Sequence, residues 1–425
     1  MKANFGLRGY RLSALVAVGT LCAVGSVQAA TPSPSGSCSA AWSASTVYTG
    51  GGTASENGVN YGANWWTQGN DPATNNGPAG SGQPWTAAGS CSGGTGTGGG
   101  TGGGGTGGGG TGGTPTPPPG PFVLSPYKDI TISMNWNTNV ISSAVTGTLA
   151  DVLTVMPTNL KTLTWAFATG ECGSETWAGI QPAALVAANV QNFVSMGKFY
   201  VISTGGASGV FTCGSDSGFT TFINRYQSAN LLGIDFDIEG GQSQDVITSL
   251  IQRVMSAQKT FPNLRFSFTL ATLGGNSPQS LSSLGAMVLN TIKSQGLTKY
   301  TINLMTMDFG STIPSNCTIV NGVCEMGQSA IAAAENLHSF YGTPYNQIEL
   351  TPMIGGNDTQ ADVFTIADVS TISAYAAQKG LAGIHYWSFD RDKDCAPGSS
   401  SPTCNSYGQA GTLGFTTHFL SSLGL

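Results

Sequence analysis

The chain has 425 residues, of which only 8% are charged, and its formal net charge is −6. It contains no cluster of Lys and Arg that could form a phosphate-binding face, which argues against a nucleic-acid partner. After the N-terminal residues 1–29, no segment approaches the roughly 20 consecutive apolar residues that a membrane-spanning helix needs, so no membrane association is expected.

The N-terminus has the pattern of a secretory signal. Residues 1–29 begin with Lys2, Arg8 and Arg11, continue through the apolar run "LSALVAVGTLCAVG" and end on the small residues "VQA". This pattern predicts cleavage after Ala29 and an exported, soluble, extracellular protein.

Cysteine usage agrees with export. Of nine cysteines, Cys22 lies in the signal, and the remaining eight are an even number, which predicts disulfides. Connectivity cannot be deduced from sequence alone, but consecutive pairing is economical because each bond then closes a loop within one region. It gives the pairs Cys38–Cys91, Cys172–Cys213, Cys317–Cys324 and Cys395–Cys404. Zinc is the rival interpretation, but the chain has no CxxC and only three scattered histidines, so we expect no metal and no cofactor.

Residues 30–91, with a core from Cys38 to Cys91, are predicted to form a small all-β module. They show no helical periodicity and are rich in aromatic residues: Trp42, Tyr48, Tyr61, Trp65, Trp66 and Trp85. A core of this size gives only marginal stability, so a Cys38–Cys91 disulfide would be needed to stabilise the module. Trp65 and Trp66 are adjacent and would point to opposite faces of a strand, which leaves one ring in solvent. An exposed ring can stack on a sugar; the alternative is that all six rings form the core.

The stretches "AWSASTVYTGGGTASENGVNYGANWWTQGNDP" and "GQPWTAAGSC" resemble the carbohydrate-binding modules of families 5 and 12, which bind chitin and sometimes cellulose. The resemblance covers nearly the whole unit. It implies that the binding aromatics are among Trp65, Trp66 and Trp85, with Tyr61 as a further candidate. Whether the module also binds cellulose is left open.

Residues 92–120 form a predicted linker of Gly, Thr and Pro. This segment has no apolar residue to bury and cannot offset the entropy cost of folding. The Gly/Thr part should behave as a flexible coil and "PTPPPG" as a stiffer polyproline segment. Its GxGxxG matches follow no strand and open no helix, so a nucleotide site is discarded.

Residues 121–425 alternate short β-rich runs with amphipathic helical stretches such as 181–197 and 243–262. This alternation predicts a (β/α)8 barrel, an α/β fold with a final helix at the C-terminus. A doubly wound open sheet is the alternative. The expected strands are 130–136, 163–168, 199–206, 231–239, 265–272, 301–309, 348–354 and 383–389.

The fourth expected strand, "GIDFDIEGG", places three acids at alternate positions. Asp235, Asp237 and Glu239 should face the barrel interior, and the intervening residues the helix layer. Neighbours on one face are roughly 6.6 Å apart, so the carboxyls should raise one another's pKa and hold a shared proton. Glu239 is nearest the C-terminal mouth and is the best general acid. A calcium site is the alternative, but calcium prefers carboxylates on a loop with polar residues between them, whereas these acids alternate with Ile and Phe on a strand.

"GIDFDIE" resembles the catalytic signature DGxDxDxE of the family 18 glycoside hydrolases, the chitinases and their relatives. "STGG", "NLMTMDFG" and "YW" resemble that family's third-, sixth- and eighth-strand motifs, in the same order along the domain. The resemblance implies a secreted chitinase. Position by position, it implies that Glu239 protonates the glycosidic oxygen, that Asp237 holds the substrate acetamido group, and that Asp235 shares a proton with Asp237. Trp387 would floor the pocket, and Met305 and Asp308 would line it.

Two positions depart from the family pattern: the first Asp of the signature falls on Leu232, and the sixth-strand tyrosine falls on Met307. The alternatives are a non-catalytic chitin-binding protein, which the presence of Glu239 opposes, and an endo-β-N-acetylglucosaminidase acting on glycans. The expected partners are chitin and chitooligosaccharides, bound by a monomer.

Overall fold

The computed structural model describes residues 38–44, 46, 48, 52–64, 67–77, 83–91 and 122–425. The predicted signal and linker lie outside these residues. The chain divides into two compact units, Met1–Gly109 and Gly110–Leu425.

The described part of the smaller unit is an antiparallel sheet in the order β1 (Thr53–Glu56), β2 (Val59–Ala63) and β3 (Trp85–Ser90). Its small core contains Ala54, Tyr61, Ala63 and Trp85. The Cys38–Cys91 disulfide joins the two ends of the described part of this unit, as expected for a core too small to be stable by itself.

The larger unit is built on a sheet in which neighbouring strands are parallel. Their order in the sheet is β4-β20-β17-β14-β13-β12-β10-β8-β5. The first strand of the chain is split: β4 pairs with β20 at one edge, and β5 pairs with β8 at the other. Because β4 and β5 are separated only by Ser125 and Pro126, these two pairings curl the sheet into a TIM-barrel-like domain. The strands are β4 (Val123–Leu124), β5 (Tyr127–Asp129), β8 (Thr162–Ala168), β10 (Phe199–Gly205), β12 (Leu231–Asp237), β13 (Arg265–Ala271), β14 (Thr301–Met305), β17 (Ile348–Thr351) and β20 (Gly383–Ile384).

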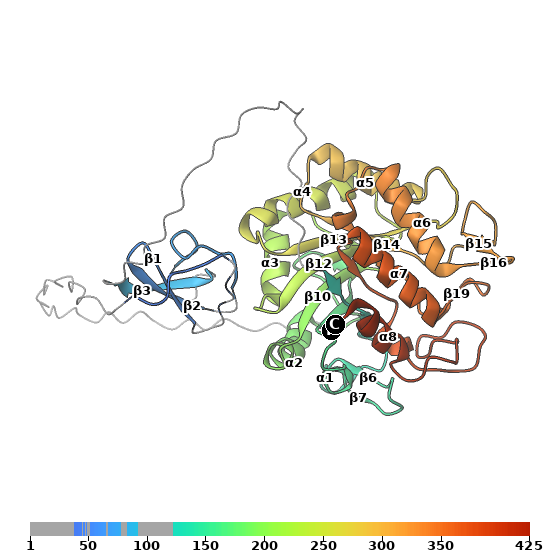
Figure 1. Ribbon diagram of the computed structural model, residues 1–425, viewed down its shortest axis with the longest axis horizontal. Helices are drawn as coiled ribbons and strands as arrows, with labels where there is room; N and C mark the ends of the chain where they lie inside the picture. The colour runs from blue at the N-terminus through green and yellow to red at the C-terminus, as the bar shows by residue number, and fades with distance from the viewer. Residues whose placement is uncertain are drawn as a thin grey trace, which may run out of the picture. The chain divides into compact units, whose positions relative to one another are not determined.

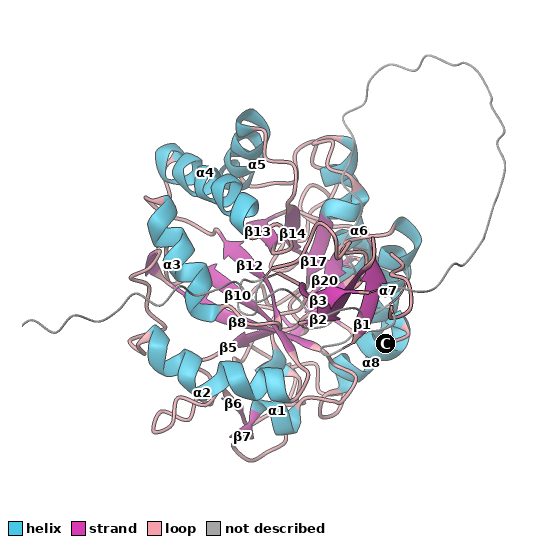
Figure 2. Ribbon diagram, turned by 90° about the vertical axis from the view of Figure 1, so that its left-hand side faces the viewer, coloured by secondary structure: helices cyan, strands magenta, loops and turns pink. Residues whose placement is uncertain are grey.

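Helices follow the strands and surround the sheet (Figures 1 and 2). Their apolar faces pack on the outward residues of the strands: Phe219 of α3 lies against Phe236 of β12, with 6.1 Å between ring centroids. The helices are α1 (Val152–Val155), α2 (Pro182–Ser195), α3 (Asp216–Tyr226), α4 (Gln244–Thr260), α5 (Ser283–Gln295), α6 (Met326–Ser339), α7 (Ile366–Lys379) and α8 (Gly414–Leu423).

Short two-stranded sheets lie in the loops of this unit. They are β6 (Ser142–Ser143) with β7 (Ala150–Asp151), β9 (Gly170–Glu171) with β11 (Phe211–Thr212), β15 (Ile319–Val320) with β16 (Val323–Cys324), and β18 (Gly355–Gly356) with β19 (Val363–Phe364). The other three disulfides join the cysteines expected from consecutive pairing. Cys172–Cys213 connects the loops after β8 and β10, which are neighbouring strands. No helix in the described ranges is both long and apolar enough to cross a membrane.

The prediction of a first strand at 130–136 is wrong. The chain forms β5 at Tyr127–Asp129 and then turns. The β-branched residues of "ITIS" suggested a strand, but Asp129 accepts hydrogen bonds from the amide and hydroxyl of Thr131 and so stabilises a turn. The other expected strands have counterparts, although several end earlier than expected. β20 contains only Gly383–Ile384 of the expected 383–389.

Candidate active site

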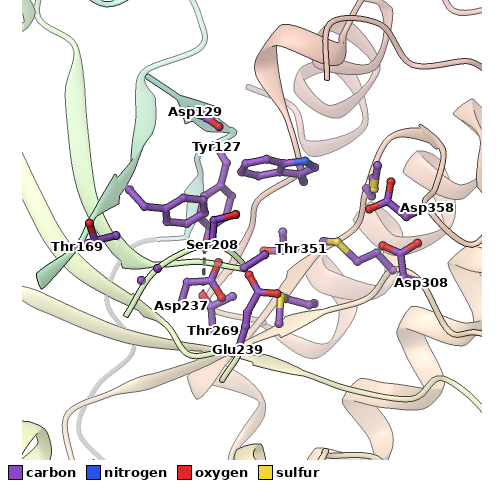
Figure 3. Close-up of a pocket in the computed structure, with 18 of the residues that line it drawn as sticks. Tyr127, Asp129, Thr169, Ser208, Asp237, Glu239, Thr269, Asp308, Thr351 and Asp358 are labelled. Atoms are coloured by element: carbon purple, nitrogen blue, oxygen red, sulfur yellow. Dashed lines mark hydrogen bonds between the residues drawn. The ribbon is translucent and has the colours of Figure 1, made fainter. Parts of the chain in front are cut away.

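A cavity of about 510 Å³ opens at the C-terminal ends of the barrel strands. Asp237, Glu239, Met305, Asp308 and Trp387, all named from the sequence, line it. Figure 3 shows Asp237, Glu239 and Asp308 with their carboxyls in this pocket. Strand alternation, which buries Ile234 and Phe236 on the other face, explains why Asp237 and Glu239 come together, whereas Asp308 comes from the segment after β14.

Asp235 lies one layer deeper than the other two acids and is 2% exposed. It is in register with Ser203 of β10 and Ser267 of β13. One carboxylate oxygen accepts hydrogen bonds from the hydroxyls of Ser267 (2.6 Å) and Thr269 (2.7 Å), and the other from Ser203 (2.6 Å) and Tyr127 (2.9 Å). Burial raises the pKa of Asp235, and these four donors oppose that effect by stabilising the charged form.

Asp237 has a different environment, although it is only 5% exposed. Its Oδ1 is buried without a hydrogen-bond partner in the described part of the chain. Burial, followed by the charges of Glu239 and Asp235, raises the pKa of Asp237 well above its ordinary value. Both effects favour the protonated form of Asp237. Asp235 and Asp237 are neighbours on the same face of β12, and the expected sharing of a proton between them remains a prediction.

Glu239 lies two residues beyond the end of β12, in the loop at the mouth, and is open to solvent. Partial desolvation, followed by the charge of Asp308, raises the pKa of Glu239. A carboxyl that remains protonated at higher pH and reaches into a pocket can serve as a general acid. In Figure 3, Asp237 and Asp308 lie on opposite sides of Glu239.

Aromatic rings form one wall of the pocket. Trp387 stacks on Phe167, with ring centroids 5.7 Å apart and an angle of 17° between their planes, and it lies 6.2 Å from the ring of Tyr127. Gly206 makes room for this wall, because a Cβ at this position would lie 2.8 Å from the Phe167 ring. Such a wall suits the apolar face of a sugar ring.

The two departures from the family pattern have different consequences. Leu232 lies where the register between β10 and β12 shifts, and it does not line the cavity. Met307 does line the cavity. The hydroxyls of Thr269 and Thr351 are also in the pocket, but they already donate to Asp235 and Asn303.

Sequence analysis missed several pocket residues, among them Tyr127, Phe167, Asp129 and Asp358. Tyr127 and Asp129 were hidden by the misplaced first strand. Phe167 occupied an expected strand, where alternation could have indicated that it faces inward. No local pattern marks Asp358, because it reaches the pocket from the long segment between β17 and α7.

In the smaller unit, the expectation that Trp85 binds sugar needs correction. Its side chain is fully buried, and its indole nitrogen donates to the carbonyl of Asn70 at 2.8 Å, so it offers no free face. Tyr61 is 5% exposed and belongs to the same core. Trp65 and Trp66 lie outside the described residues, and their role remains a prediction.

Relatives with described activities are found for part of the chain. It is 29% identical over 212 residues to a probable bifunctional chitinase/lysozyme of Escherichia coli, a match that covers 45% of this chain and 23% of the relative. It is 28% identical over 216 residues to endochitinase 11 of Metarhizium anisopliae, covering 46% and 40%. The matches thus span less than half of either relative. No family model matches the chain.

Solved structures agree with the barrel. The catalytic domain of a hyperthermophilic chitinase from Pyrococcus furiosus is 25% identical, with a TM-score of 0.55 over 72% of this chain and 98% of that one. Mutants of the same organism's chitinase domain in complex with chito-oligosaccharides are 24% identical, with a TM-score of 0.56, and show the same fold. These two relatives and these structural neighbours are described as chitinases, and the larger unit is consistent with a glycoside hydrolase.

Proposed function

We propose that the protein is a secreted chitinase that hydrolyses β-1,4 linkages between N-acetylglucosamine units. The observation that supports this most directly is the arrangement of two acids in one pocket. The buried Oδ1 of Asp237 has no hydrogen-bond partner among the described residues, and Glu239 is open to solvent. The activities described for the matched relatives point to the same substrate.

Glu239 acts as the general acid that protonates the glycosidic oxygen. The raised pKa keeps its proton available for transfer. No enzyme nucleophile is needed, because the acetamido oxygen of the substrate attacks its own anomeric carbon, an exception to the two-carboxylate scheme.

Asp237 orients the acetamido group and stabilises the cyclic cation as it forms. With its proton, it can donate to the acetamido group; as an anion, it stabilises the positive charge. Asp235, which four hydroxyl donors hold in place, shares a proton with Asp237 and does not touch the substrate.

The smaller unit is proposed to hold insoluble chitin through Trp65 and Trp66. A module that binds polymer raises the local concentration of substrate for the tethered enzyme. This also favours chitin over soluble glycans, the substrates of the alternative endo-β-N-acetylglucosaminidase.

Product analysis tests the proposal. Incubation with insoluble chitin should release acetylated oligosaccharides, and the product formed first should be the β-anomer because the anomeric carbon is inverted twice. A thiazoline analogue of the cyclic intermediate should inhibit, since it mimics the state that Asp237 stabilises. Release of α-anomer, or efficient cleavage after a deacetylated sugar, would contradict the roles given to Asp237 and Glu239.

A further inference from the structure

The catalytic pocket is acidic beyond the needs of its proposed chemistry. Five of its lining residues are carboxylic acids, and none of the lining residues in the described ranges is Lys, Arg or His. Glu239 and Asp237 have roles in the reaction. Asp308 raises the pKa of Glu239, Asp129 and Asp358 have no assigned part in the reaction, and fully acetylated chitin carries no charge for these three acids to bind.

Asp308 and Asp358 are drawn close together on the far side of Glu239 from Asp237 (Figure 3). After burial, the charge of Asp358 is among the causes that raise the pKa of Asp308, which agrees with their proximity. Asp308 accepts from the amide of Thr359 at 2.7 Å, and Asp358 accepts from the hydroxyl of Ser400. Neither contact supplies a positive charge.

The charge of Arg391 lowers the pKa of Asp308 and also acts on Asp358, but Arg391 does not neutralise this pair by contact. Arg391 is 1% exposed, and its guanidinium donates to the carbonyls of Ile354, Gly356 and Ser401. No ion pair joins it to Asp308 or Asp358 within the described residues. The pair therefore keeps capacity for a cation brought by a ligand.

A cluster of acids could simply be solvated, but here it shares a cavity with the buried, unpartnered Oδ1 of Asp237. That atom indicates a polar ligand in the same space, because leaving it unpaired is unfavourable. A sugar held at Asp237 would bring its neighbour in the polymer within reach of the other acids that line the pocket.

We propose that the pocket favours partly deacetylated chitin, with the ammonium group of a glucosamine unit bound by Asp358 next to the acetylated sugar that reacts at Asp237. This inference rests on the proposed function. It adds a charged substrate class: a polymer that alternates between acetylated and free amino sugars. The reacting sugar itself must remain acetylated, because its acetamido oxygen is the nucleophile.

The test compares the specificity constant kcat/KM on partly acetylated chitosan with that on fully acetylated oligosaccharide, at a mildly acidic pH where the amine is protonated. Asp358→Asn should lower the ratio of the two constants about twofold to fivefold, the effect of one exposed charge pair. The matched control is Asp245→Asn, which removes the same charge from the exposed first turn of α4 and should leave the ratio at the wild-type value. Added salt should lower the ratio for the wild type more than for Asp358→Asn.

Equal ratios in the wild type, Asp358→Asn and Asp245→Asn would overturn the inference, as would a ratio insensitive to salt. The acetylated substrate serves as an internal reference, so a general loss of folded enzyme does not imitate the effect. If the wild-type enzyme fails to cleave the acetylated oligosaccharide, the proposed function itself fails, and the two failures are distinguishable.

Discussion

At the scale of single residues, environment separates three acids that are chemically alike. Asp235 receives four hydroxyl hydrogen bonds, Asp237 is buried with an unpaired oxygen, and Glu239 reaches solvent. One strand and the loop after it thus supply a carboxyl held by four hydroxyl donors, a buried carboxyl whose raised pKa favours its protonated form, and a solvent-open general acid.

Glu239→Gln keeps the size of the side chain and removes its transferable proton. We expect the rate to fall by about 10² to 10⁴ while oligosaccharide binding is retained. Steady-state kinetics and binding calorimetry measure the two effects. A variant with nearly wild-type turnover would mean that the acid lies elsewhere.

Asp308→Asn should change the pH dependence of turnover. Asp308 is a like charge that raises the pKa of Glu239, so its removal lowers that pKa. Glu239 would then lose its proton at lower pH, and the alkaline limb of the kcat profile should move toward acid. Asp245→Asn, on the surface of α4, is the control. An unmoved limb in Asp308→Asn would exclude coupling between Asp308 and Glu239.

At the scale of elements, the loop after β10 and the strand β5 hold the pocket in shape. Gly205 ends β10 with φ of 88°, and a Cβ there would lie 2.1 Å from the carbonyl oxygen of Asp237. β5 carries Tyr127 into the pocket, and on its other face Lys128 pairs with Asp390 at 2.7 Å, with both side chains buried.

Gly205→Ala should lower the free energy of unfolding by at least about 2 kcal/mol, because backbone must move to admit the methyl group. The matched control is Gly240→Ala, next to Glu239, where a Cβ would meet nothing within 4 Å. Urea denaturation measures both. Equal free energies of unfolding for the two variants would show that the backbone of β12 can move to admit the methyl group without loss of stability.

Lys128→Met leaves Asp390 buried without its partner and should destabilise the domain by about 3–5 kcal/mol. Replacing both residues, with Lys128→Met and Asp390→Leu together, should cost less because no charge remains unpaired. Chemical denaturation of the two variants distinguishes the cases. If the double variant is less stable than Lys128→Met, the ion pair contributes to the free energy of unfolding by more than keeping each charge neutralised.

At the scale of the whole molecule, two units with separate cores lie in one chain. Their disulfides close within each unit, and none of the four joins them. The smaller unit should therefore contribute to activity only through the polymer it holds.

Removing residues 30–120 should leave activity on soluble oligosaccharides nearly intact and weaken action on insoluble chitin by about tenfold or more. Rates on both substrates, measured for the full and shortened chains, check this expectation. An equal loss on soluble substrate would contradict the independence of the two units.

The sequence by itself determined the alternation of strands and helices, the acids on the fourth strand and the disulfide candidates, because these depend on local periodicity and residue type. It could not locate the first strand, since the β-branched residues 130–132 imitate one while Asp129 and Thr131 form a turn. Only the tertiary structure decided that Trp85 is core, that four hydroxyls from three strands converge on Asp235, and that Asp358 joins the pocket from a distant loop. These are contacts between residues far apart in the chain, and closure of the barrel brings the pocket residues together.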